Sequence, residues 1–168
     1  LTQEQVITKT RYVEESRNHC LLRVDDDPPV TPVTPFDLSL LFDPGPTTGK
    51  RLPLVMVDYD KGFLSEHDIW EATSDALQSS SFLDTKKPLD EWCENVTFIK
   101  VNEHEFKASE AFVRANPWMQ EKLIVTLGDR GALWNGQHFA TEKQQVLDVT
   151  GAGDTFFAAF VAKFLKAL

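Results

Sequence analysis

The feature that most constrains the fold is an alternation of short apolar runs with amphipathic segments, which begins near residue 52. The run Leu54–Val57 is continuously apolar, as expected for a buried strand of a parallel sheet. Amphipathic stretches follow it and the later run Val96–Val101, and a third apolar run spans Leu123–Leu127. Strands that alternate with helices predict an α/β fold with a mostly parallel sheet, in which ligands bind outside the carboxyl ends of the strands.

Three helices are predicted in this part of the chain. Ser65 can cap the first, over residues 65–77, because Asp68 stands at the reciprocal position of a capping box. The apolar face of this helix would hold Ile69, Ala72, Ala76 and Leu77. The second helix spans residues 103–115. The third, residues 155–168, is apolar nearly all round, which predicts a buried helix.

Shorter elements complete the pattern. The pair Asn135-Gly136 is a strong hairpin signal because both residues tolerate a positive φ angle. The remaining predictions are strands at Phe82–Leu83, Ala132–Trp134, His138–Ala140 and Val146–Val149, and one helical turn at Asp90–Cys93.

The first part of the chain has a different pattern. Residues 6–13 and 19–24 read as two short strands joined by a polar turn, which predicts an antiparallel hairpin. Residues 25–35 hold three Asp and four Pro, a composition that favours an extended linker. The predicted parts are a β hairpin (1–27), a proline-rich connection (28–51) and an α/β core (52–168).

Composition excludes several classes of protein. A net charge of −9 argues against broad binding to nucleic acids or anionic membranes, although a local basic pocket remains compatible with it. Cys20 and Cys93 stand far apart, so neither a disulfide framework nor a zinc site is expected. No signal-peptide pattern opens the sequence, and no run approaches the roughly 18 apolar residues that span a bilayer. We therefore expect a soluble, cytoplasmic protein.

The strongest chemical signal is the run Asp-Val-Thr-Gly-Ala-Gly-Asp-Thr at residues 148–155, between a predicted strand and a predicted helix. Small residues there let backbone N–H groups approach a phosphate, and the helix N-terminus adds unpaired donors and a favourable dipole. Asp154, in the first turn, could accept a proton from an attacking hydroxyl while the amides stabilise the transferring phosphoryl group. A tight turn followed by an Asp that complements the helix N-terminus is the structural alternative.

This run resembles the C-terminal signature of sugar kinases of the ribokinase (PfkB) family. Residues 57–62, Val-Asp-Tyr-Asp-Lys-Gly, are similar to a segment of the family's heptose 7-phosphate kinase branch, as are the two strands of the predicted hairpin. Looser matches to the family are residues 84–87, 100–105 and 126–132. The resemblance implies a ribokinase-like (Rossmann-like) three-layer sandwich with a mostly parallel central sheet, and a small β lid formed by the hairpin.

The resemblance also implies a reaction, in which ATP phosphorylates a hydroxyl of a sugar or sugar phosphate. Asp154 would be the general base, with an anion hole formed by Gly151, Ala152 and Gly153. Contacts to the nucleotide or its phosphates would come from Lys86, Asn102, Thr126, Gly128, Gly131 and Thr150. Contacts to the sugar would come from Arg11, Arg23, Asp58 and Lys61. Glu105 would help to organise Mg²⁺ through water, and a monovalent cation is a further candidate cofactor.

Each looser match has a structural alternative. Asn102 and Glu105 have capping-box spacing. Lys86 could be a solvated charge, and Thr126 with Gly128 could be a plain strand-to-turn transition. Asp58 and Lys61 could have structural roles, and Arg11 and Arg23 could be ordinary surface charges.

The sequence also departs from the family. It resembles a fragment that lacks the N-terminal and C-terminal segments of family members, Val101 stands where a Pro is usual, and Asp60 replaces a small residue. The alternative function is therefore a non-catalytic nucleotide- or sugar-binding remnant, or a module that associates through its hairpin. Exposed lid strands offer unpaired edges, and lids of the family often dimerise, so a homodimer is expected in each case.

Overall fold

The computed structural model describes residues 6–15, 19–33, 53–74, 80–142 and 150–167, and two sheets lie in these ranges. The larger sheet has six strands in the order β3-β4-β5-β6-β7-β8. Its strands are β3 (Leu54–Asp58), β4 (Ser81–Thr85), β5 (Phe98–Asn102), β6 (Leu123–Thr126), β7 (Ala132–Trp134) and β8 (Gln137–Phe139). The first four run parallel and the last two are antiparallel, which confirms the predicted α/β class with a mostly parallel sheet.

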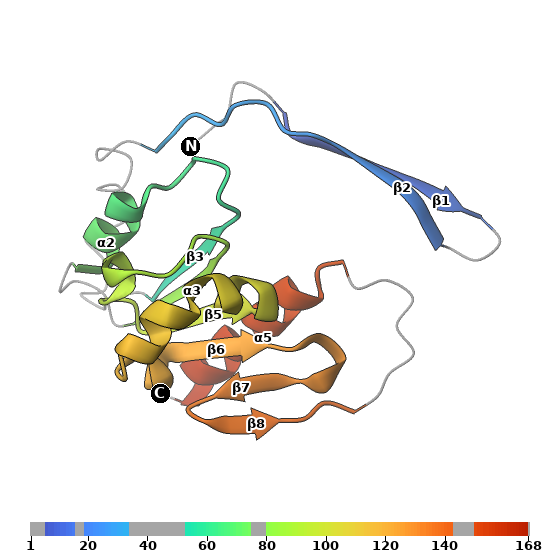
Figure 1. Ribbon diagram of the computed structural model, residues 1–168. Helices are drawn as coiled ribbons and strands as arrows, with labels where there is room; N and C mark the ends of the chain where they lie inside the picture. The colour runs from blue at the N-terminus through green and yellow to red at the C-terminus, as the bar shows by residue number, and fades with distance from the viewer. Residues whose placement is uncertain (1–5, 16–18, 34–52, 75–79, 143–149, 168) are drawn as a thin grey trace.

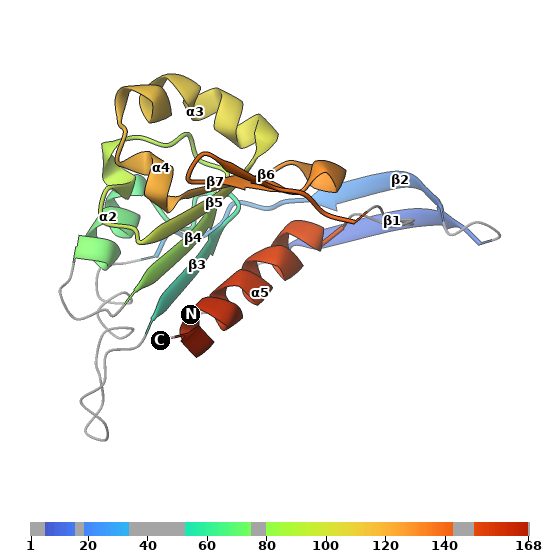
Figure 2. The same ribbon diagram turned by 90° about the horizontal axis from the view of Figure 1, so that it is seen from below.

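Helices cover both faces of this sheet and make three layers. Figure 2 shows α5 on one face and α2, α3 and α4 on the other. The helices are α2 (Glu66–Ser74), α3 (Glu103–Ala115), α4 (Met119–Lys122) and α5 (Ala152–Ala167), with 3₁₀ turns η1 (Glu91–Cys93) and η2 (Gly128–Arg130). In the same ranges no helix is long and apolar enough to cross a membrane.

Alternation along the strands supplies a core on each face of the sheet. In β4, Phe82 faces α5 and packs with Phe157 and Val161, whereas Leu83 faces the other layer. On that other face, Leu83 belongs to the larger core, which also contains Met56, Ile69, Ile99, Val101, Met119 and Val125. The five residues of β4 are all buried, as expected for a central strand covered on both faces.

Most predicted elements are confirmed, with small shifts at their ends. The capping box of α2 is present, since Ser65 Oγ and N donate to Asp68 Oδ2 and the N–H of Asp68 donates to Ser65 Oγ. In the β7–β8 hairpin, Asn135 and Gly136 have φ angles of 48° and 71°, as the turn prediction requires. The short helix α4 and the turn η2 were not predicted.

Two burial predictions were wrong. Helix α5 begins at Ala152 and buries only Phe157 and Val161 among its described residues, because one side of the helix packs on the sheet. Strand β3 lies at the edge of the described sheet, so Val55 and Val57 remain 47% exposed while Met56 is buried. The apolar patterns thus located both elements correctly, but the elements are less buried than the patterns predicted.

The N-terminal hairpin is confirmed and extends away from the core (Figure 1). It pairs β1 (Thr8–Glu14) with β2 (His19–Asp26) in antiparallel register, with an irregularity between Tyr12 and Val13. An ion pair between Lys61 Nζ and Asp27 Oδ2, at 2.5 Å, joins the base of the hairpin to the core. The proposed domain boundaries stay predictions, since residues 34–52 lie outside the described ranges, as do Ala76, Leu77 and the predicted strand Val146–Val149.

Candidate active site

The carboxyl ends of the parallel strands and the N-terminus of α5 meet at one edge of the sheet. A polar pocket of about 120 Å³ lies there. It is lined by Val57, Asp58, Tyr59, Asp84, Lys86, Lys100, Asn102, Glu105, Gly151, Gly153 and Asp154. The strands β3, β4 and β5 supply most of these residues from their last positions or the positions just after, which is where ligands bind in open α/β sheets.

The loop at the start of α5 combines a glycine of positive φ angle with the N-terminus of a helix. Gly151 has a φ angle of 77°, in the region that favours glycine, and its carbonyl oxygen accepts the N–H of Thr155 at 2.9 Å. Ala152 begins the helix, so the N–H groups of its first turn lack acceptors within the helix, and Gly153 and Asp154 of this turn line the pocket. Thr150 precedes the loop and is exposed. Asp154 stands in the first turn, as predicted.

Asp154 is exposed and accepts a hydrogen bond from a residue of another element. The hydroxyl of Tyr59, which directly follows β3, donates to Asp154 Oδ1 at 3.0 Å. Burial raises the pKa of Tyr59, and the hydrogen bond and negative charge of Asp154 raise it further. The phenol is therefore a protonated donor at neutral pH.

A buried ion pair lies beneath the loop. Lys100 Nζ of β5 donates to Asp84 Oδ2 of the adjacent strand β4 at 2.8 Å, and both side chains are about nine-tenths buried. A Cβ atom at Gly153 would lie 3.0 Å from Lys100 Nζ, so the glycine lets the ammonium group approach the loop closely. Burial raises the pKa of Asp84, while the hydrogen bond and charge of Lys100 oppose that rise.

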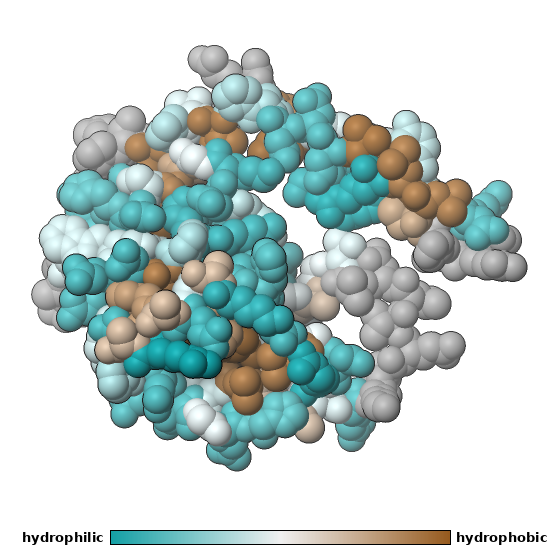
Figure 3. All heavy atoms as spheres, viewed as in Figure 1, coloured by the Kyte–Doolittle hydropathy of each residue, from teal (hydrophilic) through white to brown (hydrophobic). Residues whose placement is uncertain are grey.

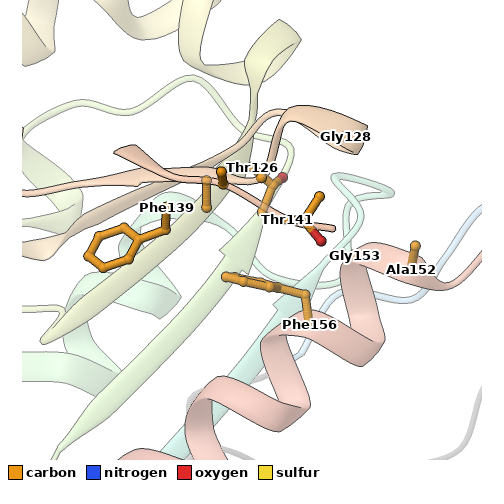
Figure 4. A pocket seen from close by; sticks show the side chains of 10 residues that line it. Thr126, Gly128, Phe139, Thr141, Ala152, Gly153 and Phe156 are labelled. Atoms are coloured by element: carbon orange, nitrogen blue, oxygen red, sulfur yellow. The ribbon is translucent and has the colours of Figure 1, made fainter. Parts of the chain in front are cut away.

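A larger and more apolar cavity of about 390 Å³ lies on the other side of Gly153. It is lined by Thr126, Gly128, Gly131, Ala132, Phe139, Ala140, Thr141, Ala152, Gly153 and Phe156. Figure 4 shows Phe156 of α5 pointing toward the strands that carry Thr126 and Phe139. Both aromatic side chains remain partly exposed, at 37% and 44%. The cavity has the size and the apolar lining of a small-molecule site.

Gly131 shapes this cavity through the backbone. Its φ angle is 94°, and a Cβ atom there would lie only 1.9 Å from the carbonyl oxygen of Phe139. We expect Gly131→Ala to lower the free energy of unfolding by about 3 kcal/mol, since the backbone must move to relieve both the strain and the clash. Urea unfolding measures this.

Gly136→Ala is the matched control for that change. Gly136 also has a positive φ angle, 71°, but nothing lies within 4 Å of the Cβ position. The expected cost is therefore about 1 kcal/mol, from the left-handed conformation alone. Equal costs for the two variants would contradict the close approach of Gly131 to Phe139.

Asn102 and Glu105 form the complete capping box of α3. The N–H of Asn102 donates to Glu105 Oε2 at 2.6 Å, and the N–H of Glu105 donates to Asn102 Oδ1 at 2.9 Å. Asn102 Nδ2 donates to Glu105 Oε1 at 2.8 Å, so both oxygens of Glu105 accept hydrogen bonds. The structural alternative is thus present, and both residues also line the polar pocket.

Asp58 and Lys61 are held by contacts within the protein. The buried carboxylate of Asp58 accepts the N–H of Asp60 at 3.1 Å and the hydroxyl of Thr85 at 3.0 Å. Lys61 pairs with Asp27 of the hairpin base and does not line the pocket. Asp60, which stands where the family usually has a small residue, has a φ angle of 53° and pairs with Lys87. It therefore has a structural role.

The predicted cationic side chains differ in their distance from the pocket. Lys86 is exposed, lines the polar pocket, and places Nζ 4.7 Å from the ring centroid of Tyr59. Arg11 and Arg23 are cross-strand partners on the exposed hairpin, and Arg23 pairs with Asp25 at 2.7 Å. Neither arginine lines a pocket described above.

The register places these arginines on the face of the hairpin that turns toward the site. Lys9 pairs with Asp25, two positions from the pair of Arg11 and Arg23, so all four side chains share one face. Lys9 Nζ lies 5.6 Å from the ring centroid of Tyr59. The charged face of the hairpin therefore begins beside Tyr59, whose hydroxyl donates to Asp154.

Residues that sequence reasoning missed complete the site. Tyr59, Asp84 and Lys100 lay inside segments noted for their resemblance, but no role was assigned to them. A signal existed, because Asp84 and Lys100 are charged residues within otherwise largely apolar strands, and Tyr59 directly follows one. Phe139 and Phe156 gave no such signal, since apolar side chains on a strand and a helix are normally assigned to the core.

Comparison with known proteins identifies a family and several relatives. A family model described as pfkB family carbohydrate kinase matches residues 67–168. The bifunctional protein HldE of a Nitratiruptor species is 35% identical over 130 residues, which cover 66% of this chain and 27% of that protein. The bifunctional protein HldE of Pseudomonas aeruginosa is 29% identical over 176 residues, which cover 95% and 36%. That of Salmonella arizonae is 28% identical and covers 93% and 35%. The chain thus spans about a third of the length of the curated relatives that it matches.

Proposed function

The chain belongs to the pfkB family of carbohydrate kinases, and on this basis we propose that it transfers a phosphoryl group from ATP to a hydroxyl of a sugar or sugar phosphate. The observation that carries the proposal is the position of Gly153. This residue lines both the polar pocket that holds Asp154 and the apolar cavity beside it. A nucleotide in the cavity would direct its phosphates past the loop and toward Asp154.

In the proposed reaction Asp154 accepts the proton of the acceptor hydroxyl. The hydroxyl oxygen forms a bond to the γ-phosphorus, the bond from that phosphorus to the β–γ bridging oxygen breaks, and ADP leaves. The N–H groups at the start of α5, around Gly151, Ala152 and Gly153, would stabilise negative charge on the transferring group. Lys86, exposed at the pocket, would contact phosphate oxygens.

The apolar cavity would receive the nucleoside part of ATP. Its aromatic walls, Phe139 and Phe156, are partly exposed and can contact the faces of a base. Thr126 and the turn between Gly128 and Gly131 would place backbone groups against the ribose or the phosphates. Thr150, just before the loop, would serve the phosphates as well.

The residues present fit a magnesium ion only when phosphates share it. Among the described residues, no three His, Cys, Asp or Glu side chains cluster as metal ligands would. Mg²⁺ keeps several waters and commonly takes one or two carboxylates together with substrate phosphates. Glu105 would hold such an ion through water, given that Asn102 already occupies both of its oxygens. When bound, the ion would neutralise charge on the phosphates. A monovalent cation remains a candidate from family resemblance alone.

We propose heptose 7-phosphate as the first acceptor to test. Residues 57–62 and the hairpin strands resemble the branch of the family that phosphorylates this sugar, and the relatives above are bifunctional proteins HldE. Lys9, Arg11 and Arg23 share the hairpin face that turns toward the site, and a phosphorylated sugar would match their charge. Other sugar phosphates and hexoses are the alternatives.

The test is turnover of ATP with Mg²⁺ against a panel of sugars and sugar phosphates. Stimulation by one acceptor, with formation of its phosphorylated product, would support the proposal and name the substrate. No turnover, with ATP still raising the melting temperature, would overturn it in favour of the non-catalytic nucleotide-binding remnant.

A homodimer through the hairpin is part of the proposal. Tyr12, Leu22 and Val24 share the face opposite the charged one and are 55%, 55% and 47% exposed. Figure 3 shows hydrophobic side chains gathered along the hairpin. A second copy would cover this face and pair an open strand edge.

Sedimentation of the chain checks the dimer. We expect twice the monomer mass for the wild-type chain and the monomer mass for Leu22→Glu, because the new carboxylate would be desolvated at the interface. A wild-type chain that stays monomeric at high concentration would contradict the dimer.

A further inference from the structure

The side chain of Tyr59 contacts three segments that lie far apart in the sequence. Its hydroxyl donates to Asp154 Oδ1 of α5 at 3.0 Å. Its ring lies against Lys86, which follows β4, and against Lys9 of the hairpin, with Nζ atoms 4.7 Å and 5.6 Å from the ring centroid. Such cation–π contacts fix the position of an otherwise exposed ring.

The proposed base needs a partner that fixes its orientation. Asp154 is exposed in the first turn of α5, where its side chain has several rotamers. In the part of the chain that the structure describes, the recorded hydrogen bond to its carboxylate is that from Tyr59. This bond occupies Oδ1 and leaves Oδ2 for an acceptor hydroxyl.

We infer that Tyr59 is a positioning residue, whose hydroxyl holds the Asp154 carboxylate in the orientation that receives the acceptor's proton. The inference rests on the proposed role of Asp154 as base. It assigns to the Tyr59 hydroxyl a contribution to the rate of the chemical step and none to the binding of ATP, because that hydroxyl bonds to the Asp154 carboxylate and the ring does not line the apolar cavity. The raised pKa of the phenol keeps it a donor throughout the neutral range.

Tyr59→Phe tests the inference because it keeps the ring between its lysines and removes only the hydroxyl. We expect kcat to fall about tenfold, the worth of one hydrogen bond to a charged group, with KM for ATP unchanged. In the Asp154→Asn background the same substitution should cause no further fall, since Tyr59 acts through the carboxylate. An unchanged kcat in Tyr59→Phe, or equal falls in both backgrounds, would overturn the inference.

A titration of the phenol tests the pair without turnover. The chain has two tyrosines, so Tyr12→Phe leaves Tyr59 as the single phenol whose ionisation is read from ultraviolet absorbance. Asp154→Asn in that background should lower the pKa of Tyr59, because the substitution removes the negative charge that opposes ionisation. An unchanged pKa of Tyr59 would overturn the interaction between Tyr59 and Asp154 without contradicting the proposed kinase activity. A shifted titration in a chain without turnover would instead overturn the base role of Asp154, and with it the positioning role of Tyr59.

Discussion

Asp154→Asn is expected to lower kcat by about 10²- to 10⁴-fold, the usual contribution of a general base. The amide cannot accept the proton of the acceptor hydroxyl. It does keep an oxygen that can accept the hydrogen bond of Tyr59, so the loop at the start of α5 should retain its conformation. KM for ATP should stay the same, because the apolar cavity is unchanged. Steady-state kinetics with the acceptor found in the panel measure both constants.

Glu71→Gln is the matched control for this variant. Glu71 is exposed on α2, away from both pockets, and the substitution makes the same change from carboxylate to amide. Its kcat should equal that of the wild-type chain. Thermal unfolding with ATP measures nucleotide binding separately from turnover. The nucleotide should raise the melting temperature of Asp154→Asn as much as that of the wild type. A variant Asp154→Asn with wild-type kcat would remove the carboxylate from the mechanism.

The fold was largely predictable because its signals are local. The apolar runs at β3, β5 and β6 and the caps at Ser65 and Asn102 depend on residues next to one another, and the structure contains each of them. Burial was less predictable, since it depends on what covers a face. Val55 on the edge strand and Phe156 on α5 belong to apolar patterns, yet they are exposed among the described residues.

The candidate site was predictable where chemistry and spacing coincide. The loop from Gly151 to Asp154 is recognisable in the sequence as small residues before a helix, and it lies at the predicted edge of the sheet. The contacts of Tyr59 with Asp154 and of Lys100 with Asp84 join residues 95 and 16 positions apart. Such pairs depend on the register of the strands and on the placement of α5, which no local pattern specifies.

Lys100→Met is expected to lower the free energy of unfolding by about 3 to 5 kcal/mol, because it leaves the buried carboxylate of Asp84 without its partner. Methionine fills nearly the same space, so the cost reports the uncompensated charge and not a cavity. Lys107→Met is the control, since Lys107 is exposed and pairs with Glu103 at 3.8 Å on the surface of α3. Its cost should stay below about 0.5 kcal/mol. Urea unfolding of both variants makes the comparison.

The pH dependence of the stability lost in Lys100→Met identifies the cause of that loss. Burial raises the pKa of Asp84 in the folded chain, so its protonated form favours folding, and this contribution is lost as the pH rises from about 4 through the raised pKa. Lys100→Met removes the cation that opposes the rise, so the pKa moves higher still. The penalty should therefore be larger at about pH 8 than at about pH 4.5. Adding Asp84→Asn should restore most of the stability at the higher pH, because the amide carries no charge to desolvate. A penalty that is equal at both pH values, and that Asp84→Asn does not reduce, would show that the cost of Lys100→Met comes from packing against Gly153 and not from the ion pair.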